Sequence, residues 1–302
     1  MDGAVLTVFG ELAAAAPPAD GRRPGVVVLG MHRSGTSAVT RALNLLGLSV
    51  APASDLVGAG PGNERGHWES RTLVECNELI LRAAGACSWR PPPAGGAWLA
   101  SPGVRALVPL CRAAFRVVHP HGPWVWKDPR TCLTAGLWLS LPAVPPAVVL
   151  VVRHPVAVAR SLNARDGFAF PYCLAMWERY VRESLRVSAG LPVWITWFEE
   201  LLDAPEEWAD TASRFLRISG VVPDGRLPGP GLLRPYLDPR LRHHTGEEGE
   251  APRGLRLSSE QQRLLDRLQW LTGTHRSFPP PVLPDETPGT QGRFAVPQAV
   301  TA

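Results

Sequence analysis

The feature that most constrains the fold is the stretch VVVLGMHRSGTSAVTRALNLLG, Val26 to Gly47. Its first four residues form an unbroken apolar run that ends at Gly30, a pattern typical of a strand buried on both faces of a parallel sheet. From Thr36 onward, apolar residues recur at helical spacing, and Gly47 is a natural end for the helix. The stretch therefore predicts a strand, a glycine-containing loop and a helix.

The loop itself is close to the phosphate-binding pattern G-x-x-x-x-G-K-[ST], but Thr36 stands where the lysine would be. The glycines permit a tight turn whose N–H groups point at an anion, and Thr36 and Ser37 add hydroxyls at the helix start. Arg33 brings a guanidinium that can reach phosphate or sulfate oxygens. The loop indicates an anion site, although a strand–turn–helix without any ligand explains the same residues.

Apolar runs and helical patterns alternate along the rest of the chain. Strands are predicted at 124–126, 147–152 and 193–196, and helices near 36–46, 70–85, 101–118, 172–187, 199–202, 206–216 and 259–271. This alternation predicts an α/β fold of the P-loop-NTPase-like type, a parallel sheet flanked by helices. Lys127-Asp128 and Arg153 each follow a predicted strand directly. Ligands of such sheets bind at the carboxyl ends of the strands, so we expect these residues to lie near the glycine loop.

Composition limits the class of protein. The 302 residues are 45% hydrophobic and 19% charged with a net charge of +4, as in an ordinary globular chain. We expect an N-terminal extension at 1–24, one α/β domain at 25–276, and a disordered Pro-rich tail at 277–302. The chain has no apolar run long enough for a membrane span, and its arginines are too scattered for a nucleic-acid surface.

The cysteines and the single lysine are informative in different ways. Five widely spaced cysteines without a C-x-x-C pair or zinc-ligand spacing predict reduced thiols in a cytoplasmic protein, and no metal site. Among 31 basic residues the only lysine is Lys127. A compact ammonium differs from a planar guanidinium, so a lysine kept at a strand end indicates a specific task. Chance survival of one lysine in an arginine-biased chain is the alternative.

Two segments together resemble the sulfotransferase superfamily. That family binds the 5′-phosphosulfate of 3′-phosphoadenosine 5′-phosphosulfate (PAPS) with a [KR]-S-G-T-[TS] loop, here Arg33 to Ser37, and its 3′-phosphate with R-x-P-x-x-x-x-x-S, here Arg153 to Ser161. The segment WKDPRTCLTAG is similar to the K-D-P region of bacterial and tyrosylprotein-type members, in which the lysine stabilises the transferring sulfuryl group. The resemblance covers roughly residues 25–200.

The resemblance implies a PAPS-dependent sulfotransferase that acts on a hydroxyl or amine without a metal. The implied donor-binding residues are Arg33, Ser34, Gly35, Thr36, Ser37, Arg153 and Ser161. Lys127, Arg33 and a general base are the implied catalytic residues. Glu69 is the favoured base, because NERGHWES is similar to a segment of bacterial members, with Glu64, His67 and Asp128 as alternatives. A helix start would also favour a carboxylate at Glu69.

Several points stay open at this level. The C-terminal donor motif of the cytosolic family members is absent, which leaves Arg240 and Arg242 as candidates for the adenosine end. The acceptor is a small molecule, a carbohydrate or a peptide. A P-loop kinase-like phosphoryl transferase and a non-catalytic nucleotide-binding partner protein are the alternative functions. Nothing in the sequence indicates an oligomeric state.

Overall fold

The computed structural model describes residues 24–60, 63–139, 141, 144–222, 231, 233–237 and 255–295. The first 23 residues of the predicted N-terminal extension, the end of the tail from residue 296, and the candidates Arg240 and Arg242 lie outside the described residues. Most of residues 223–254 lie outside them as well. The domain boundaries at residues 24 and 276 remain predictions.

A five-stranded sheet forms the centre of the fold, in the order β2-β1-β3-β4-β5. The strands are β1 (Gly25–Leu29), β2 (Trp124–Lys127), β3 (Ala147–Val152), β4 (Val193–Trp197) and β5 (Gly273–His275). The first four run parallel and β5 is antiparallel to β4. β1 lies between β2 and β3, so that Val28 pairs with both Lys127 and Val149. The predicted α/β fold class is confirmed, and every residue of β1, β2 and β3 is buried.

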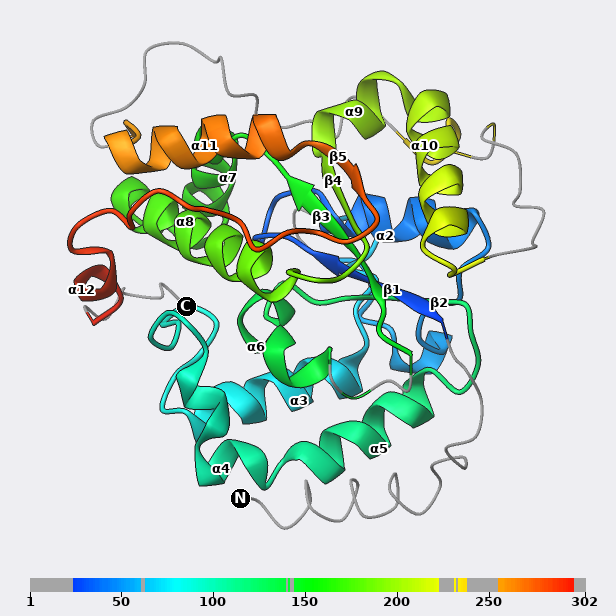
Figure 1. Ribbon diagram of the computed structural model, residues 1–302, viewed down its shortest axis with the longest axis horizontal. Helices are drawn as coiled ribbons and strands as arrows, with labels where there is room; N and C mark the ends of the chain where they lie inside the picture. The colour runs from blue at the N-terminus through cyan, green and yellow to red at the C-terminus, as the bar shows by residue number, and fades with distance from the viewer. Residues whose placement is uncertain are drawn as a thin grey trace.

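Helices cover both faces of the sheet, as Figure 1 shows. One face carries α2 (Thr36–Leu45), α9 (Phe198–Asp203) and α10 (Pro205–Ile218), which share a core with Val26 and Val28. The other face carries α3 (Arg71–Ala83), α5 (Val108–Val118), α6 (Thr131–Trp138), α7 (Pro155–Asp166), α8 (Phe170–Val187) and α11 (Ser259–Leu271). These pack on Val27 and Leu29. Successive β1 residues thus face opposite layers, which is why the strand is apolar throughout.

The shorter elements complete the described chain. They are the single-turn helices η1 (Ala53–Asp55) and η2 (Ala97–Ala100), α4 (Pro102–Arg105) and α12 (Thr290–Ala295). Local sequence explains several helix starts. The Ser70 hydroxyl accepts a hydrogen bond from the Leu73 amide at 3.1 Å and caps α3. Pro155 occupies the first turn of α7, where its missing N–H costs nothing. Among the described residues, none of the helices is both long and apolar enough to cross a membrane.

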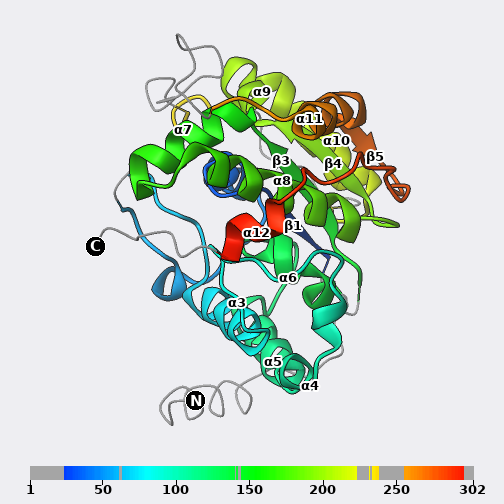
Figure 2. The ribbon, with the colours of Figure 1, turned by 90° about the vertical axis from the view of Figure 1, so that its left-hand side faces the viewer.

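The predicted disorder of the C-terminal tail is wrong for residues 277–295. This segment runs along the outside of α8 before forming α12 (Figures 1 and 2). Phe278 and Phe294 are buried, and Glu286 forms an ion pair with the buried Arg179 of α8 at 2.8 Å. The high proline content suggested disorder, but two aromatic anchors and one carboxylate supply enough buried contact to hold the segment in place.

Candidate functional site

The loop from Gly30 to Ser37 leaves β1 and enters α2 in a tight turn. Arg33 and Gly35 both adopt left-handed backbone conformations, with φ of 69° and 85°. A Cβ on Gly35 would lie 2.1 Å from the Phe198 ring, so only glycine fits there. The Ser34 amide closes the turn by donating to the Met31 carbonyl at 3.1 Å. The loop has the strand–turn–helix shape in which backbone amides surround an anion.

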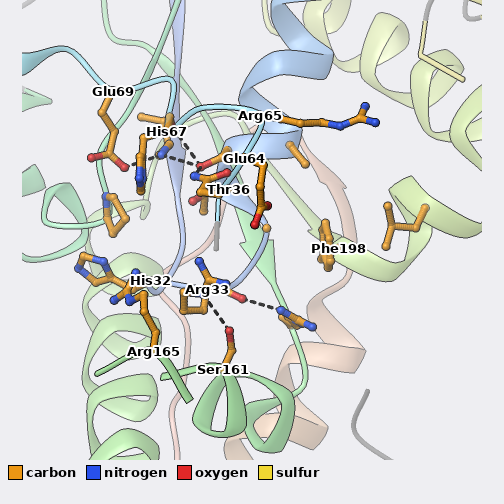
Figure 3. Close-up of a pocket in the computed structure, with 18 of the residues that line it drawn as sticks. His32, Arg33, Thr36, Glu64, Arg65, His67, Glu69, Ser161, Arg165 and Phe198 are labelled. Atoms are coloured by element: carbon orange, nitrogen blue, oxygen red, sulfur yellow. Dashed lines mark hydrogen bonds and ion pairs between the residues drawn. The ribbon is translucent and has the colours of Figure 1, made fainter. Parts of the chain in front are cut away.

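A hollow of about 1030 Å³, counting its open side, lies over the carboxyl ends of the parallel strands. Most of the predicted site residues line it: Arg33, Gly35, Thr36, Ser37, Glu64, His67, Glu69, Lys127, Arg153 and Ser161. Ser34 and Asp128, which are 1% and 0% exposed, do not line it. Figure 3 shows Glu69 and His67 at one end of the hollow and Arg33, Ser161 and Arg165 at the other.

One end of the hollow, the lysine end, contains Lys127, Glu69 and Ser37 and is centred on an enclosed ion pair. Lys127 is 1% exposed, and its Nζ donates to Glu69 Oε1 at 2.6 Å and to Ser37 Oγ at 3.1 Å. Asn63 Nδ2 donates to the same hydroxyl at 3.2 Å, and that hydroxyl donates to the His67 carbonyl at 3.1 Å. β2 therefore positions the ammonium, and the first turn of α2 positions the serine. The charge of the only lysine is balanced inside the protein.

A polar network behind the hollow supports this ion pair. Arg130 Nη1 lies 3.0 Å from Asp128 Oδ1 and 3.9 Å from Glu69 Oε2, so Glu69 has a second cation nearby. Asn77 Nδ2 donates to Asp128 Oδ2 at 2.8 Å. Burial raises the pKa of Asp128, while Arg130 and the hydrogen bond from Asn77 act in the opposite direction. Asp128 is fully enclosed, which makes it a positioning group rather than one that contacts a ligand.

The opposite end of the hollow, the arginine end, contains Arg33, Arg153 and Ser161. Two short hydrogen bonds join the loop, the segment after β3 and helix α7 there. Arg33 Nε of the loop donates to Ser161 Oγ of α7 at 2.8 Å. Arg153, which follows β3 directly, donates from Nη1 to the Arg33 carbonyl at 2.9 Å, and its Nε lies 3.9 Å from Glu199 Oε1. Burial lowers the pKa of the Arg33 guanidinium from its usual value. The arginines stay charged at neutral pH, and they converge where the loop meets α7.

Several polar and aromatic side chains that line the hollow were not predicted from the sequence, among them His32, Asn63, Arg65, Arg165, Phe198 and Tyr236. Arg165 carried a usable signal, because it lies four residues after Ser161 on one helix and therefore on the same face. Phe198 directly follows β4, so the strand-end rule that marked Lys127 and Arg153 could have found it. Tyr236 had no such signal, since it reaches the hollow only through the packing of a distant segment. Burial also lowers the pKa of His67, so that its imidazole is neutral at pH 7.

Comparisons with known proteins extend to fold only. No protein-family model and no curated protein matches the chain. Among solved structures, it is similar to the sulfotransferase domain from the curacin biosynthetic pathway, with a TM-score of 0.43 and 16% identity over 91% of this chain and 98% of that one. It is also similar to the sulfotransferase domain of the Synechococcus PCC 7002 olefin synthase, with a TM-score of 0.39 and 20% identity over 92% and 98%. Neither of these two domains belongs to the tyrosylprotein-type branch.

Proposed function

We propose that the chain is a sulfotransferase that moves a sulfuryl group from PAPS to an acceptor hydroxyl or amine. The observation that carries the proposal is the meeting of three features in one hollow: the Gly30–Ser37 loop, Arg153 with Ser161, and the enclosed Lys127. Each feature lies at the carboxyl end of a parallel strand, except that Ser161 lies on the helix after β3. Ligands of such sheets bind at this edge. A cytoplasmic location and the chemical class of the acceptor stay predictions.

The arginine end suits the phosphates of the donor. The loop amides and the N-terminus of α2 would hold the 5′-phosphosulfate, because a helix N-terminus attracts negative charge. Arg153 and Ser161 would hold the 3′-phosphate. Their links to Arg33, at 2.9 and 2.8 Å, support this assignment, because they join the two phosphate sites in one hydrogen-bonded cluster. A guanidinium fork matches phosphate oxygens better than an ammonium does.

The lysine end suits the transfer step. The acceptor oxygen forms a bond to sulfur while the bond from sulfur to the 5′-phosphate oxygen breaks, and the electron pair leaves with the phosphate. Negative charge develops on the sulfuryl and phosphate oxygens, where the Lys127 ammonium would stabilise it. Arg33 would hold the leaving phosphate from the loop. Catalysis of this kind depends on positioning and on fixed charges, as in phosphoryl transfer.

The competing functions fit the residues less well. A P-loop kinase needs a lysine after the second glycine, where this chain has Thr36, and a carboxylate near Mg²⁺ at a strand end. Arg153 follows β3, and Asp128 after β2 is fully enclosed and paired with Arg130. A non-catalytic nucleotide-binding protein would need the arginine end but has no use for an enclosed Lys127–Glu69 pair. Such a pair is costly to bury without a function.

A thermal-shift panel tests the proposal. Wild-type protein is heated with 3′-phosphoadenosine 5′-phosphate (PAP), ADP or ATP, each with and without Mg²⁺. We expect PAP to stabilise the protein far more than ADP does, because only PAP carries the 3′-phosphate. A ligand at 100 times its dissociation constant adds about 2.7 kcal/mol to the free energy of unfolding. Equal shifts with PAP and ADP, or a shift that requires Mg²⁺, would favour the kinase-like alternative.

A further inference from the structure

His32 is an unexplained polar side chain in the wall of the hollow. It precedes Arg33 in the loop and is 9% exposed. Its Nε2 is enclosed without a hydrogen-bond partner, and within the described part of the chain Nδ1 forms no hydrogen bond either. A polar group left unpaired in the interior costs about 1–3 kcal/mol, so such groups often have a functional explanation.

Aromatic side chains fix the ring of His32. Its centroid lies 4.6 Å from the Trp89 ring and 5.7 Å from the Tyr180 ring, which stands nearly edge-on. Trp89 is itself braced by Phe168, with centroids 5.1 Å apart. The imidazole is therefore held in one orientation, and a ligand in the hollow meets a ring that is already in place.

The surroundings keep this imidazole neutral. Burial lowers the pKa of His32 well below 6.5, and the positive charges of Arg130, Arg165, Lys127 and Arg33 lower it further. Tyr180, the other titratable group packed against the ring, is uncharged, because burial raises its pKa well above 10. A neutral imidazole carries one N–H and one free lone pair. Since Nε2 is enclosed, the nitrogen available to a ligand is Nδ1.

Glu69, the base favoured from the sequence, is less free to accept a proton. It holds Lys127 at 2.6 Å and lies 3.9 Å from Arg130. Protonation of this carboxylate would remove the partner of an enclosed ammonium, and an enclosed charge without a partner is strongly destabilising. Among the residues that the structure describes, none forms an ion pair with His32. In Figure 3, His32 lies between Glu69 and Arg165 on one side of the hollow.

We propose that His32 Nδ1 binds the acceptor hydroxyl and takes its proton as the oxygen attacks sulfur, while Glu69 holds Lys127 in position. This inference rests on the proposed sulfuryl transfer. The O–H bond breaks as the O–S bond forms, and the proton ends on Nδ1 of a ring that already carries a proton on Nε2. The bound donor brings negative charge to Arg33 and Lys127 and so offsets two of the cations that disfavour an imidazolium.

The test compares His32→Gln with a matched control, His119→Gln. His119 is also a buried imidazole without hydrogen-bond partners, but it lies between Phe115 and Trp124 at the end of α5, away from the hollow. Transfer from ³⁵S-labelled PAPS is measured with two probes, benzyl alcohol and a nitrophenol that is already ionised at the assay pH. Calorimetry with PAP measures donor binding, and a proton NMR titration follows His32 with and without PAP.

We expect His32→Gln to bind PAP normally and to lose transfer to the alcohol by ~100-fold or more, the usual scale for a general base. Transfer to the ionised nitrophenol should hardly change, because that acceptor has no proton to give up. PAP should raise the pKa of His32 in the wild-type protein, and His119→Gln should leave transfer to both probes unchanged. If His32→Gln unfolds, His32→Asn replaces it in the same assays.

Equal losses with both probes would overturn the inference, because a structural role does not distinguish them. A parallel loss of PAP affinity would overturn it too, because His32 would then serve the donor. A wild-type protein that does not bind PAP would refute the proposed sulfotransferase and this inference with it. A wild-type enzyme that transfers sulfate, beside a His32→Gln variant of equal activity, would refute the inference alone.

Discussion

The two ends of the hollow handle positive charge differently. At the lysine end, the ammonium of Lys127 lies 2.6 Å from a carboxylate and is almost fully enclosed. At the arginine end, Arg33 donates a short hydrogen bond to a hydroxyl, Arg153 donates one to a backbone carbonyl, and Arg153 also lies 3.9 Å from Glu199. An anion at the arginine end can add to contacts that are already in place. An anion at the lysine end must share or replace Glu69.

This difference suggests a division of tasks between the two ends. The arginine end should contribute mostly to donor affinity, because its contacts with phosphate exist from the moment of binding. The lysine end should contribute mostly to the rate, because weakening the ion pair is worthwhile only when charge develops on the transferring group. Substitutions at the two ends should therefore separate binding from turnover.

Lys127→Ala should have the largest effect. We expect transfer to fall by ~100–1,000-fold, the scale for losing one preorganised electrostatic group, with PAP affinity nearly unchanged. Lys127→Arg should restore little, because a planar guanidinium places its charge elsewhere. Radiolabelled sulfate transfer and calorimetric binding of PAP are the measurements. An arginine variant with full activity, or an alanine variant that loses affinity and rate equally, would remove the distinction between the two ends.

A double variant controls for the stability of the lysine end. Lys127→Ala leaves Glu69 enclosed without its partner, and breaking a buried ion pair costs about 3–5 kcal/mol. Lys127→Met combined with Glu69→Gln removes both charges, so it should recover most of this stability in urea denaturation. Transfer should stay low, because the ammonium is still missing. Recovery of activity together with stability would mean that Lys127 only supports the fold.

Arg153→Ala should have the next largest effect, on affinity. A charge-assisted hydrogen bond contributes about 1.5–3 kcal/mol, so PAP should bind about 10- to 150-fold more weakly. Affinity for ADP, which lacks the 3′-phosphate, should hardly change. Arg112→Ala, on the exposed side of α5, is the control for a lost positive charge. Equal weakening of PAP and ADP would assign Arg153 to the structure of the loop instead.

The last prediction concerns stability and sets the pH range in which the two ends can be compared. Burial lowers the pKa of His119 to about 3. Below its unfolded pKa of about 6.5, the unfolded chain binds a proton that the folded protein excludes. Stability should therefore be complete above that pH and fall on acidification toward pH 3 by up to about 1.4 kcal/mol per pH unit. His32, also neutral in the folded protein, contributes with the same sign.

Urea denaturation at several pH values between neutral and mildly acid measures this slope. His119→Phe keeps an aromatic ring between Phe115 and Trp124. It should lower the dependence of the unfolding free energy on pH by the contribution of one bound proton. A slope unchanged in this variant would show that His119 is protonated or solvated in the folded protein. Assays on Lys127 and Arg153 variants are best made near neutral pH, where neither buried histidine contributes to unfolding.

The sequence predicted the parallel strands well because each is buried on both faces and reads as an unbroken apolar run. It did not reveal α6, for a related reason: nearly all of its residues are buried, so no polar face marks the helical period. β5 has only three residues, too few for a pattern. The C-terminal segment was misjudged because its hold on α8 depends on Phe278 and Glu286 rather than on local composition.

The sequence could predict those site residues that lie at strand ends or in the glycine loop. Lys127 and Arg153 were found because each lies at the carboxyl end of a strand, and Arg33 was found because it lies in the glycine loop after β1. Nothing local marked His32, whose neutral state depends on Trp89 and Tyr180 from distant segments. The pairing of Lys127 with Glu69 was also hidden, since the two residues are 58 positions apart and meet only when β2 lies beside the loop before α3.

The lone Lys127 has a practical consequence for chemical labelling. Apart from the chain terminus, an acylating reagent such as acetic anhydride finds one amino group in this sequence, and that group is 1% exposed. It reacts only when the protein opens around it and the ammonium releases both its carboxylate partner and a proton. The slow mass increase of a single peptide in native protein would therefore report how often this buried amine becomes accessible. A compound that fills the hollow should slow that labelling, which offers a screen for ligands that needs no knowledge of the acceptor.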